Sequence, residues 1–505
     1  MRILYIDIDT LRPDHLGCYG YHRPTSPNID ALANDGIRFD AVYASDTPCL
    51  PSRSALVTGR FGIHNGVVGH GGTAADLRLE GYGRGFQSLA AITSWPRRLR
   101  FAGLRTASIS TFAERHSAYH WNAGFNEVFN IGKMGMERAE EVTPLALDWL
   151  GRNGAADGWF LHVHFWDPHT PYRTPADFGD PFAGDDLPAW LTEDVRAAHW
   201  ELPGPHSPQE AMGHTAGTLV EGIRRMGQLW GGNPPGYEDM VARRQPEQIA
   251  SMDDVRRMFD GYDTGVRYAD HHVGILLNEL DRLGVLDETV VMVSGDHGET
   301  LGELALYCDH ATADLYTSRL PMILRWPGLG DGRVDGARHY QIDVAATILD
   351  LLGVRVPANW DGVSFAEALK RGEEDGRSAI VTTHGAHTVQ RGVSFEGWWL
   401  VRTWHDGWHP YPEHMLFDLE ADPHEQEDLA EKYPEVVAQG LEILAGWHSE
   451  QMATASGPDP IETILAEGGP WHFRGLEKDY WQRLRDTGRG QWAQVLAERH
   501  GLSLA

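Results

Sequence analysis

Short runs of apolar and β-branched residues recur along the chain, separated by segments that we interpret as helices. The clearest of these runs cover residues 3–8, 106–110, 159–164, 289–294 and 321–326. Strands that alternate with helices predict a mainly parallel sheet covered by helices on both faces. The chain has 505 residues, of which 42% are hydrophobic, so we expect a large α/β fold with an ample core.

Polar residues with candidate chemistry follow three of the predicted strands. Asp9, His169 and Asp296 each fall shortly after such a run. In α/β sheets, ligands and catalytic groups gather outside the carboxyl ends of the strands. The pattern therefore predicts a functional site at that edge of the sheet.

Two changes in composition divide the chain. The Gly- and Pro-rich stretch at about 176–237 indicates a long insertion in a position to cover the site. A charged stretch at 370–377 marks the second change, and the last seventy or so residues, rich in tryptophan and charge, are predicted to be helical. We expect a catalytic domain over residues 1–370 and a C-terminal subdomain with a helical tail over 371–505.

The charge and the ends of the chain restrict its partners and its location. The formal net charge is −29, which disfavours nucleic acid and anionic membranes as partners because their phosphates would be repelled. Three cysteines cannot build a disulfide framework. The first residues form a predicted strand that contains Asp7 and Asp9 rather than a signal peptide, and no apolar run is long enough to span a bilayer. We expect a soluble, cytoplasmic protein.

The most informative motif is the stretch TPCLPSRSALVTGR at residues 47–60. It contains the pattern C-x-P-x-R from Cys49 to Arg53, followed by Leu, Thr, Gly and Arg. With these offsets it resembles the signature of the type I sulfatases, within the alkaline phosphatase superfamily. The resemblance implies that a maturation enzyme oxidises Cys49 to formylglycine. One oxygen of the hydrated aldehyde would attack sulfur or phosphorus, and the other would later expel the product.

A second segment extends the resemblance to roughly residues 1–435. Residues 415–430, MLFDLEADPHEQEDLA, resemble the sulfatase segment LYDLxxDPxExxNLA of a small C-terminal domain. The resemblance implies an alkaline phosphatase-like fold, with a large mainly parallel or mixed sheet between helices. A smaller C-terminal α+β domain would carry an antiparallel sheet, to which a predicted strand at 397–402 would belong.

Two further motifs resemble the metal-binding segments of the family. Residues 9–20 match the opening motif, although many sulfatases have two consecutive aspartates where this chain has Asp9 and Thr10. Residues 294–299, SGDHGE, match the second motif. These matches leave Asp9 as the carboxylate of the opening motif.

The resemblance implies that Asp9, Asp296, His297 and the matured side chain of Cys49 hold one divalent cation. Carboxylates suit a hard cation, and an imidazole also suits a softer one such as manganese. Ca²⁺ is the first expectation by resemblance, with Mn²⁺ or Mg²⁺ second. We interpret Asp7 as pointing elsewhere and leave it out of the site.

Two residues are expected to handle the anion and the proton. Arg53 lies four residues after Cys49, one turn along a helix that starts at the cysteine. By resemblance its guanidinium would hold the hydrated aldehyde and offset negative charge. His169 lies in the segment PHTPY, where the family histidine takes the proton from the second oxygen of the hydrate. His162 and His164 are interpreted as packed or solvent-facing histidines.

The chain departs from the family where sulfate-binding lysines are usual. In place of the motif G-K-W-H-L-G it has Thr111 at the lysine and Ala113 at the histidine, and residues 307–321 contain no lysine. We expect Thr111 to donate a hydrogen bond to the bound anion, and His310 to contact the substrate and to protonate the leaving group. The histidines left open for the same task are His64, His116 and His214.

The leading functional hypothesis is hydrolysis of a sulfate monoester by a sulfuric ester hydrolase. A site with fewer permanent cations also suits a monoanionic ester, so the alternative is a formylglycine-dependent phosphonate monoester hydrolase or phosphodiesterase. An inactive homologue that only binds is the remote alternative, which the retained site residues disfavour. The expected partners are a small anionic ester and the maturation enzyme, with a homo-oligomer left open.

Overall fold

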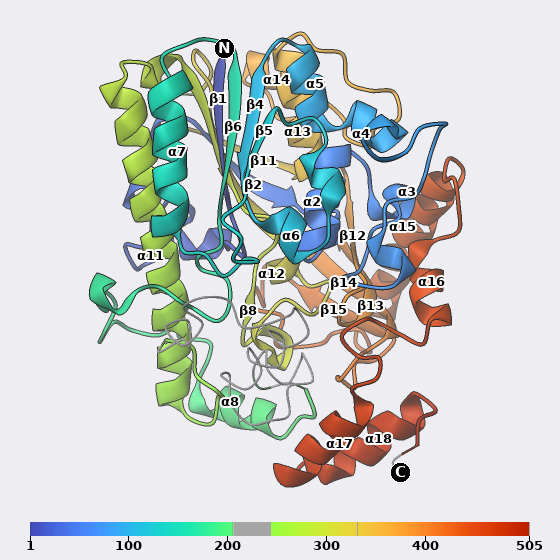
Figure 1. Cartoon of the computed structure of the whole chain (residues 1–505). Helices are drawn as coiled ribbons and strands as arrows, with labels where there is room; N and C mark the ends of the chain where they lie inside the picture. The colour runs from blue at the N-terminus through green and yellow to red at the C-terminus, as the bar shows by residue number, and fades with distance from the viewer. Residues whose placement is uncertain (205, 207–243, 331, 504–505) are drawn as a thin grey trace.

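The computed structural model describes residues 1–204, 206, 244–330 and 332–503 (Figure 1). About half of the insertion expected at 176–237, with His214 in that half, lies outside the described residues. The domain boundary expected near residue 370 stays a prediction.

The larger sheet has eight strands in the order β11-β2-β10-β7-β1-β6-β4-β5. Their bounds are Arg333–Tyr340, Ile37–Tyr43, Arg319–Arg325, Thr289–Ser294, Arg2–Ile8, Trp159–Phe165, Arg105–Ile109 and Glu127–Phe129. All five strands predicted from the apolar runs are confirmed, with ends that differ by at most two residues.

Parallel strands form the centre of this sheet. β1 pairs in parallel with β6 on one side and with β7 on the other. β10 is antiparallel to both of its neighbours, so the sheet is mixed. The carboxyl ends of β1, β6 and β7 therefore meet at one edge, and the site residues follow them there.

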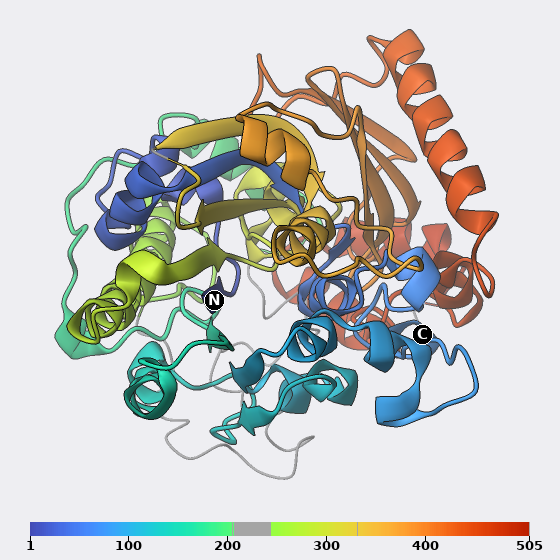
Figure 2. The ribbon, with the colours of Figure 1, turned by 90° about the horizontal axis from the view of Figure 1, so that it is seen from above.

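Helices cover both faces of the sheet (Figures 1 and 2). On one face α7 (Ala139–Asn153) and α11 (Met252–Arg282) pack against Leu4, Ile6 and Ile8 of β1. On the other face α2, α5 and α13 pack against Ile3 and Tyr5. Their bounds are Cys49–Thr58, Trp95–Phe101 and Gln341–Leu351. Successive β1 residues thus point to opposite faces, as a strand requires.

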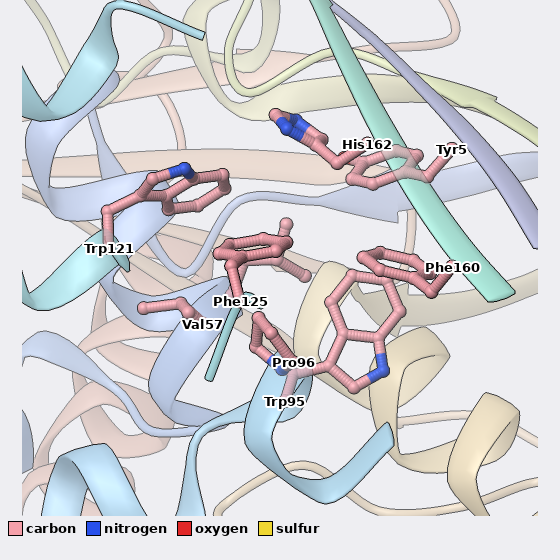
Figure 3. A pocket seen from close by; sticks show the side chains of 9 residues that line it. Tyr5, Val57, Trp95, Pro96, Trp121, Phe125, Phe160 and His162 are labelled. Atoms are coloured by element: carbon pink, nitrogen blue, oxygen red, sulfur yellow. The ribbon is translucent and has the colours of Figure 1, made fainter. Parts of the chain in front are cut away.

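A small apolar cavity lies between the sheet and the α2 face (Figure 3). Its volume is about 10 Å³, and aromatic side chains supply most of its lining, among them Trp121, Phe125 and Phe160. This volume holds at most one water molecule, and the lining offers few polar partners. The cavity is therefore a packing gap, and His162 forms part of its wall.

The smaller sheet has the order β15-β14-β13-β12-β3. Its bounds are His414–Asp418, Trp398–His405, Val389–Phe395, Ile380–His384 and Asp46–Thr47. β12 to β15 are antiparallel, and α15 (Pro434–Met452) packs against them. β3 comes from the N-terminal part of the chain and pairs with β12, two residues before Cys49. The second sheet therefore reaches the site directly.

Helices α16, α17 and α18 form the described part of the C-terminal tail, with bounds Pro460–Ala466, Glu477–Asp486 and Gly490–Arg499. Tyr480, Trp481 and Leu484 of α17 pack with Leu496 of α18 around Trp408. The tail thus has a small apolar core of its own. Among the described helices, none is both long and apolar enough to cross a membrane.

Candidate active site

Five loops and one helix carry the predicted site residues. Asp9 directly follows β1, and its backbone N–H donates to the carbonyl of Phe165 at 2.9 Å. Asp296 and His297 follow β7, while Cys49 is the first residue of α2. The helix is buried along its whole length, which fixes the position of that first residue.

Glycine at position 298 lets the loop after β7 approach its neighbour. A Cβ atom there would lie 2.0 Å from the carbonyl oxygen of Tyr316. The backbone N–H of Gly298 donates to Thr317 at 3.0 Å, and its carbonyl accepts from Nδ1 of His297 at 2.8 Å. This last bond leaves Nε2 of His297 as the nitrogen that carries the lone pair.

Four side chains form a compact group of potential metal ligands. Ligand atoms of Asp9, Cys49, Asp296 and His297 all lie within 4.8 Å of one another. Nε2 of His297 is 3.0 Å from Sγ of Cys49, 3.4 Å from Oδ2 of Asp296 and 3.9 Å from Oδ1 of Asp9. That Oδ1 atom is buried without a hydrogen-bond partner. Carboxylate oxygens with one imidazole lone pair fit a divalent cation.

Arg53 is surrounded by carboxylates. Its Nε and Nη2 donate to the two oxygens of Asp7 at 2.8 and 3.0 Å, and Nη1 donates to Asp9 at 2.8 Å and also to Asp296. Nη2 also lies 2.7 Å from Nε2 of His164. All five N–H donors thus have partners here, so the guanidinium holds the carboxylates in place.

The interpretation that Asp7 points away from the site is wrong. Residues two apart in a strand share a face, so Asp7 lies with Ile3 and Tyr5 on the face that α2 covers. From that face its carboxylate reaches Arg53. The period of the strand was sufficient to place Asp7 beside Asp9.

The charges of this group are unbalanced. Burial acts to raise the pKa of Asp7 and of Asp9, but Arg53 and nearby histidines outweigh it and hold both pKa values well below the usual range. Burial raises the pKa of Asp296 well above its ordinary value, against the effect of Arg53. If all three carboxylates are ionised, they leave two negative charges beside the one guanidinium, and a divalent cation would balance these charges and favour the ionised form of Asp296.

His162 and His164 share the face of Asp7 because β6 pairs in register with β1. Tyr5 lies opposite His162, and Asp7 opposite His164. His164 is fully buried, with Nδ1 2.9 Å from the hydroxyl of Ser110 and Nε2 3.4 Å from Asp9. Both are packed histidines, as expected, but they pack against the site's carboxylates.

Thr10 directly follows Asp9, in place of the second aspartate of the motif that the opening segment resembles. Its backbone N–H donates to Oδ1 of Asp296 at 3.3 Å, and its backbone has a positive φ of 54°. Its buried hydroxyl has no hydrogen-bond partner. A neutral hydroxyl therefore stands beside the carboxylates at this position.

A second group lies on the other side of the cysteine. Ligand atoms of Cys49, His169 and His310 lie within 4.8 Å of one another. Nδ1 of His169 donates to the carbonyl of Thr170, which leaves its Nε2 free to accept a proton. The His310 ring lies 4.4 Å from that of His297 between centroids. Cys49 is the one residue that these two groups share.

Thr111 is engaged within the protein. Its hydroxyl donates to the carboxylate of Glu137 and accepts from Trp166 at 3.1 Å and from the backbone of Gly135 at 2.9 Å. Donation to a bound anion would require the bond to Glu137 to break. Its role in substrate binding stays a prediction.

His64 and His116, the two described histidines left open as replacements for the missing lysines, differ in their hydrogen-bond partners. His64 bonds to Asp361 at 2.7 Å and to the carbonyl of Gln451 at 2.8 Å, which marks it as structural. His116 has a buried Nε2 atom without a hydrogen-bond partner. Only His116 of this pair has bonding capacity to offer a substrate.

Comparison with known families identifies the chain. The family described as Sulfatase matches residues 2–354, and the family described as N-sulphoglucosamine sulphohydrolase, C-terminal, matches residues 307–444. The chain belongs to the sulfatase family. The first match covers both potential metal-binding motifs and the cysteine motif of this sulfatase.

Several known proteins resemble this sulfatase over most of their length. An N-acetylglucosamine-6-O-sulfatase of Bacteroides thetaiotaomicron is 24% identical over 92% of this chain and 89% of its own. A solved structure in complex with its substrate D-glucosamine-2-N,6-O-disulfate has a TM-score of 0.69 at 21% identity, covering 91% of this chain and 99% of that one. The phosphonate monoester hydrolase of Agrobacterium radiobacter has a TM-score of 0.64 at 19% identity, covering 89% and 96%.

These comparisons confirm the expected family, fold class and reaction type. This sulfatase has the alkaline phosphatase-like fold, with a mixed sheet between helices and a smaller antiparallel sheet. Its family and its named relatives are sulfatases, which supports the expected hydrolysis of a sulfate ester. The family is metal-dependent, and the group around Cys49 is the potential metal-binding cluster.

Proposed function

We propose that this sulfatase acts through a formylglycine made from Cys49. The observation that carries the proposal is the place of the Sγ atom, which belongs both to the group of potential metal ligands and to the pair His169 and His310. Sγ stands in for the oxygens of the matured and hydrated side chain. When matured, this side chain supplies one oxygen that attacks the sulfur atom and a second that expels the sulfate.

Thiol chemistry has little support at this position. Burial, reinforced by Asp9 and Asp296, raises the pKa of Cys49 well above its ordinary value. The thiolate, which is the nucleophilic form of cysteine, is therefore disfavoured. The side chain is also only 1% exposed, so we expect the maturation enzyme to modify the chain before it folds.

One divalent cation fits the group of Asp9, Asp296, His297 and the matured residue 49. Calcium is the first choice, and manganese or magnesium the second. Bound there, the cation would supply Lewis-acid polarisation of the ester. The expected contact of Arg53 with the hydrated aldehyde stays a prediction, because carboxylates and His164 already engage its N–H donors. Through these contacts Arg53, together with Asp7, would position the carboxylates.

His169 would accept the proton that leaves the second oxygen of residue 49. Burial lowers the pKa of His169 to about 3, although Asp9 acts to raise it. The neutral form, which accepts a proton, therefore predominates at all pH values above about 3.

We expect His169→Gln to lower kcat by roughly 10²–10⁴-fold, the usual contribution of a general base. As pH is lowered through 6.5, the ordinary pKa of histidine, the wild-type rate should not fall because of His169, since this side chain is still neutral there. Steady-state kinetics across pH 5–9 measure both. A variant within tenfold of the wild-type rate would contradict the assignment.

His310 would protonate the departing alcohol. Its Nδ1 atom is buried without a partner, but burial and the neighbouring histidines lower its pKa. The charged form must therefore be favoured by the bound anion, and activity through it should fall as pH rises.

We expect His310→Gln to slow esters of poorly acidic alcohols roughly 10²–10⁴-fold, and esters of acidic phenols much less. Rates for a series of aryl and alkyl sulfates test this difference. Equal slowing of all of them would assign His310 to anion binding or to folding instead.

The phosphonate monoester hydrolase or phosphodiesterase remains the second candidate. The reason is the absence of lysine from residues 307–321 and the presence of Thr111 in place of a lysine. Parallel assays of mature protein on an aryl sulfate, an aryl phosphonate monoester and an aryl diester would decide between them. A cytoplasmic location and a homo-oligomer stay expectations.

A further inference from the structure

A row of histidine rings leads away from the active site. His310 lies 5.9 Å from His387 between ring centroids, and His387 stacks on His472 at 4.1 Å and 10°. Nε2 of His472 is 3.2 Å from Nδ1 of His70, whose ring lies 5.0 Å from that of His116. We call these five residues the histidine row.

The row runs from the buried site toward the surface. His310 and His387 are each only 7% exposed, whereas His70, His116 and His472 are half-buried. Its members come from widely separated segments: the loop after α3, the end of α6, the loop after β9, the β12–β13 loop and the segment after α16. Their bounds are Gly62–Asn65, Phe112–Arg115, Tyr307–Asp309, Ile380–His384, Val389–Phe395 and Pro460–Ala466.

The row holds unused hydrogen-bonding capacity. Nδ1 of His310, Nδ1 of His387, Nε2 of His70 and Nε2 of His116 are all buried without a partner. Buried polar side-chain atoms normally have partners, because an unsatisfied one costs free energy. Four such atoms in one row indicate that a polar ligand, rather than the protein, supplies their hydrogen bonds.

The rings of His70, His116 and His387 favour the uncharged form. Burial and the neighbouring imidazoles lower the pKa of His70 and of His387 well below the ordinary value, and burial and Arg115 do the same for His116. A neutral imidazole offers one donor and one acceptor. The row therefore presents both kinds of hydrogen-bonding group to whatever lies against it.

We propose that the histidine row is the subsite for the alcohol portion of the sulfate ester, and that this alcohol is an uncharged polyol such as a saccharide. The proposal rests on the proposed function, because it takes Cys49 as the point of attack. The row begins at His310, next to that cysteine, and continues to the surface. An alcohol attached to the reacting sulfate would extend along the same direction.

The chemistry of the row favours hydroxyl groups. Each hydroxyl both donates and accepts, so it can pair with either nitrogen of a neutral ring. A second anion would only accept and would meet no permanent cation within the row. In the described part of the chain, the nitrogens of His70, His116 and His387 do not form a group within 4.8 Å, which disfavours a metal site.

The C-terminal tail helps to build this subsite. The backbone N–H of His472 donates to the carbonyl of Ala386 at 3.1 Å, next to His387. The neighbouring Trp471 is 51% exposed and lies so close to Gly71 that a Cβ atom there would be 2.2 Å from the indole. The guanidinium of Arg474 lies over the same indole, 5.6 Å from the ring centroid, so the exposed part of Trp471 marks the outer end of the row.

The test uses His116→Phe and His387→Phe in fully matured enzyme. Phenylalanine keeps a planar aromatic ring and removes the nitrogens, and in each of the two histidines one buried ring nitrogen has no hydrogen-bond partner to lose. We measure kcat/KM for a panel of monosaccharide monosulfates and for 4-nitrophenyl sulfate. Each variant should lower the ratio of saccharide to aryl activity roughly tenfold, mainly through KM, with an unchanged Tm.

The matched control is His272→Phe. His272 is a buried histidine on α11 that bonds Thr143 on the opposite face of the large sheet. This control should leave the ratio unchanged. An unchanged ratio in His116→Phe and His387→Phe overturns the subsite. Wild-type enzyme that hydrolyses the aryl sulfate but none of the saccharides overturns the polyol while the proposed function stands.

Two other outcomes are also decisive. Mature enzyme inactive on every sulfate ester overturns the proposed function itself. A second metal equivalent in the wild type that His387→Phe loses would make the row a metal site and overturn the polyol subsite.

Discussion

Replacing Cys49 by alanine is expected to lower kcat by roughly 10⁴–10⁶-fold, the scale of loss seen when an enzyme loses its nucleophile. The variant should fold, because the change removes one sulfur atom from a site that Arg53 and three carboxylates hold together. Unmatured wild-type protein should be equally inactive, since a buried thiol with a raised pKa cannot supply a hydrated aldehyde.

Two measurements check this expectation. Mass spectrometry of the peptide that carries residue 49 reports conversion to formylglycine, and sulfatase activity should rise in proportion to that conversion. Cys18→Ala is the matched control, because Cys18 is a free cysteine outside both groups around Cys49 and should leave activity intact. Full activity in protein whose Cys49 is still a thiol would refute the mechanism.

Asp296→Asn is expected to remove the bound cation and to lower kcat at least 10³-fold. The side chain keeps its shape but loses the negative charge that a divalent cation requires. Because Asp9 and Asp7 still pair with Arg53, and because burial already disfavours the charge of Asp296, Tm in the presence of chelator should change by only a few degrees. Elemental analysis and thermal unfolding measure the two effects.

Asp7→Asn is the matched control for the metal. Asp7 shares the guanidinium of Arg53 but is not in the group of potential ligands. It should keep one equivalent of metal while activity falls more modestly. If both variants lose the metal alike, the cation depends on the charge of the whole cluster rather than on the proposed ligands.

Some site residues were predictable because their signals are local. The strand that ends before Asp9, the motif around Cys49 and the segment around Asp296 each lie within a few residues of sequence. The two-residue period of a strand also predicts that Asp7 lies on the same face as Asp9. The interpretation that Asp7 points elsewhere was therefore wrong. The true face follows directly from the burial of Ile3 and Tyr5 beside it.

Other features depend on contacts between distant segments. The pairing of Thr111 with Glu137 spans 26 residues and ties up a hydroxyl that looked available in the sequence. His164 meets Arg53 only because β6 lies next to β1 in register. These contacts cannot be predicted from the spacing of the residues along the chain.

By itself, the sequence determined the family, the main parallel strands and the order of the cysteine and candidate metal motifs. Hydrophobic runs and short motifs record which face a residue takes and what chemistry it carries, because these properties depend on near neighbours. Only the tertiary structure decided that His70, His387 and His472 stand in one row and that the tail contributes to it. Packing between remote segments sets such distances and leaves no local pattern in the chain.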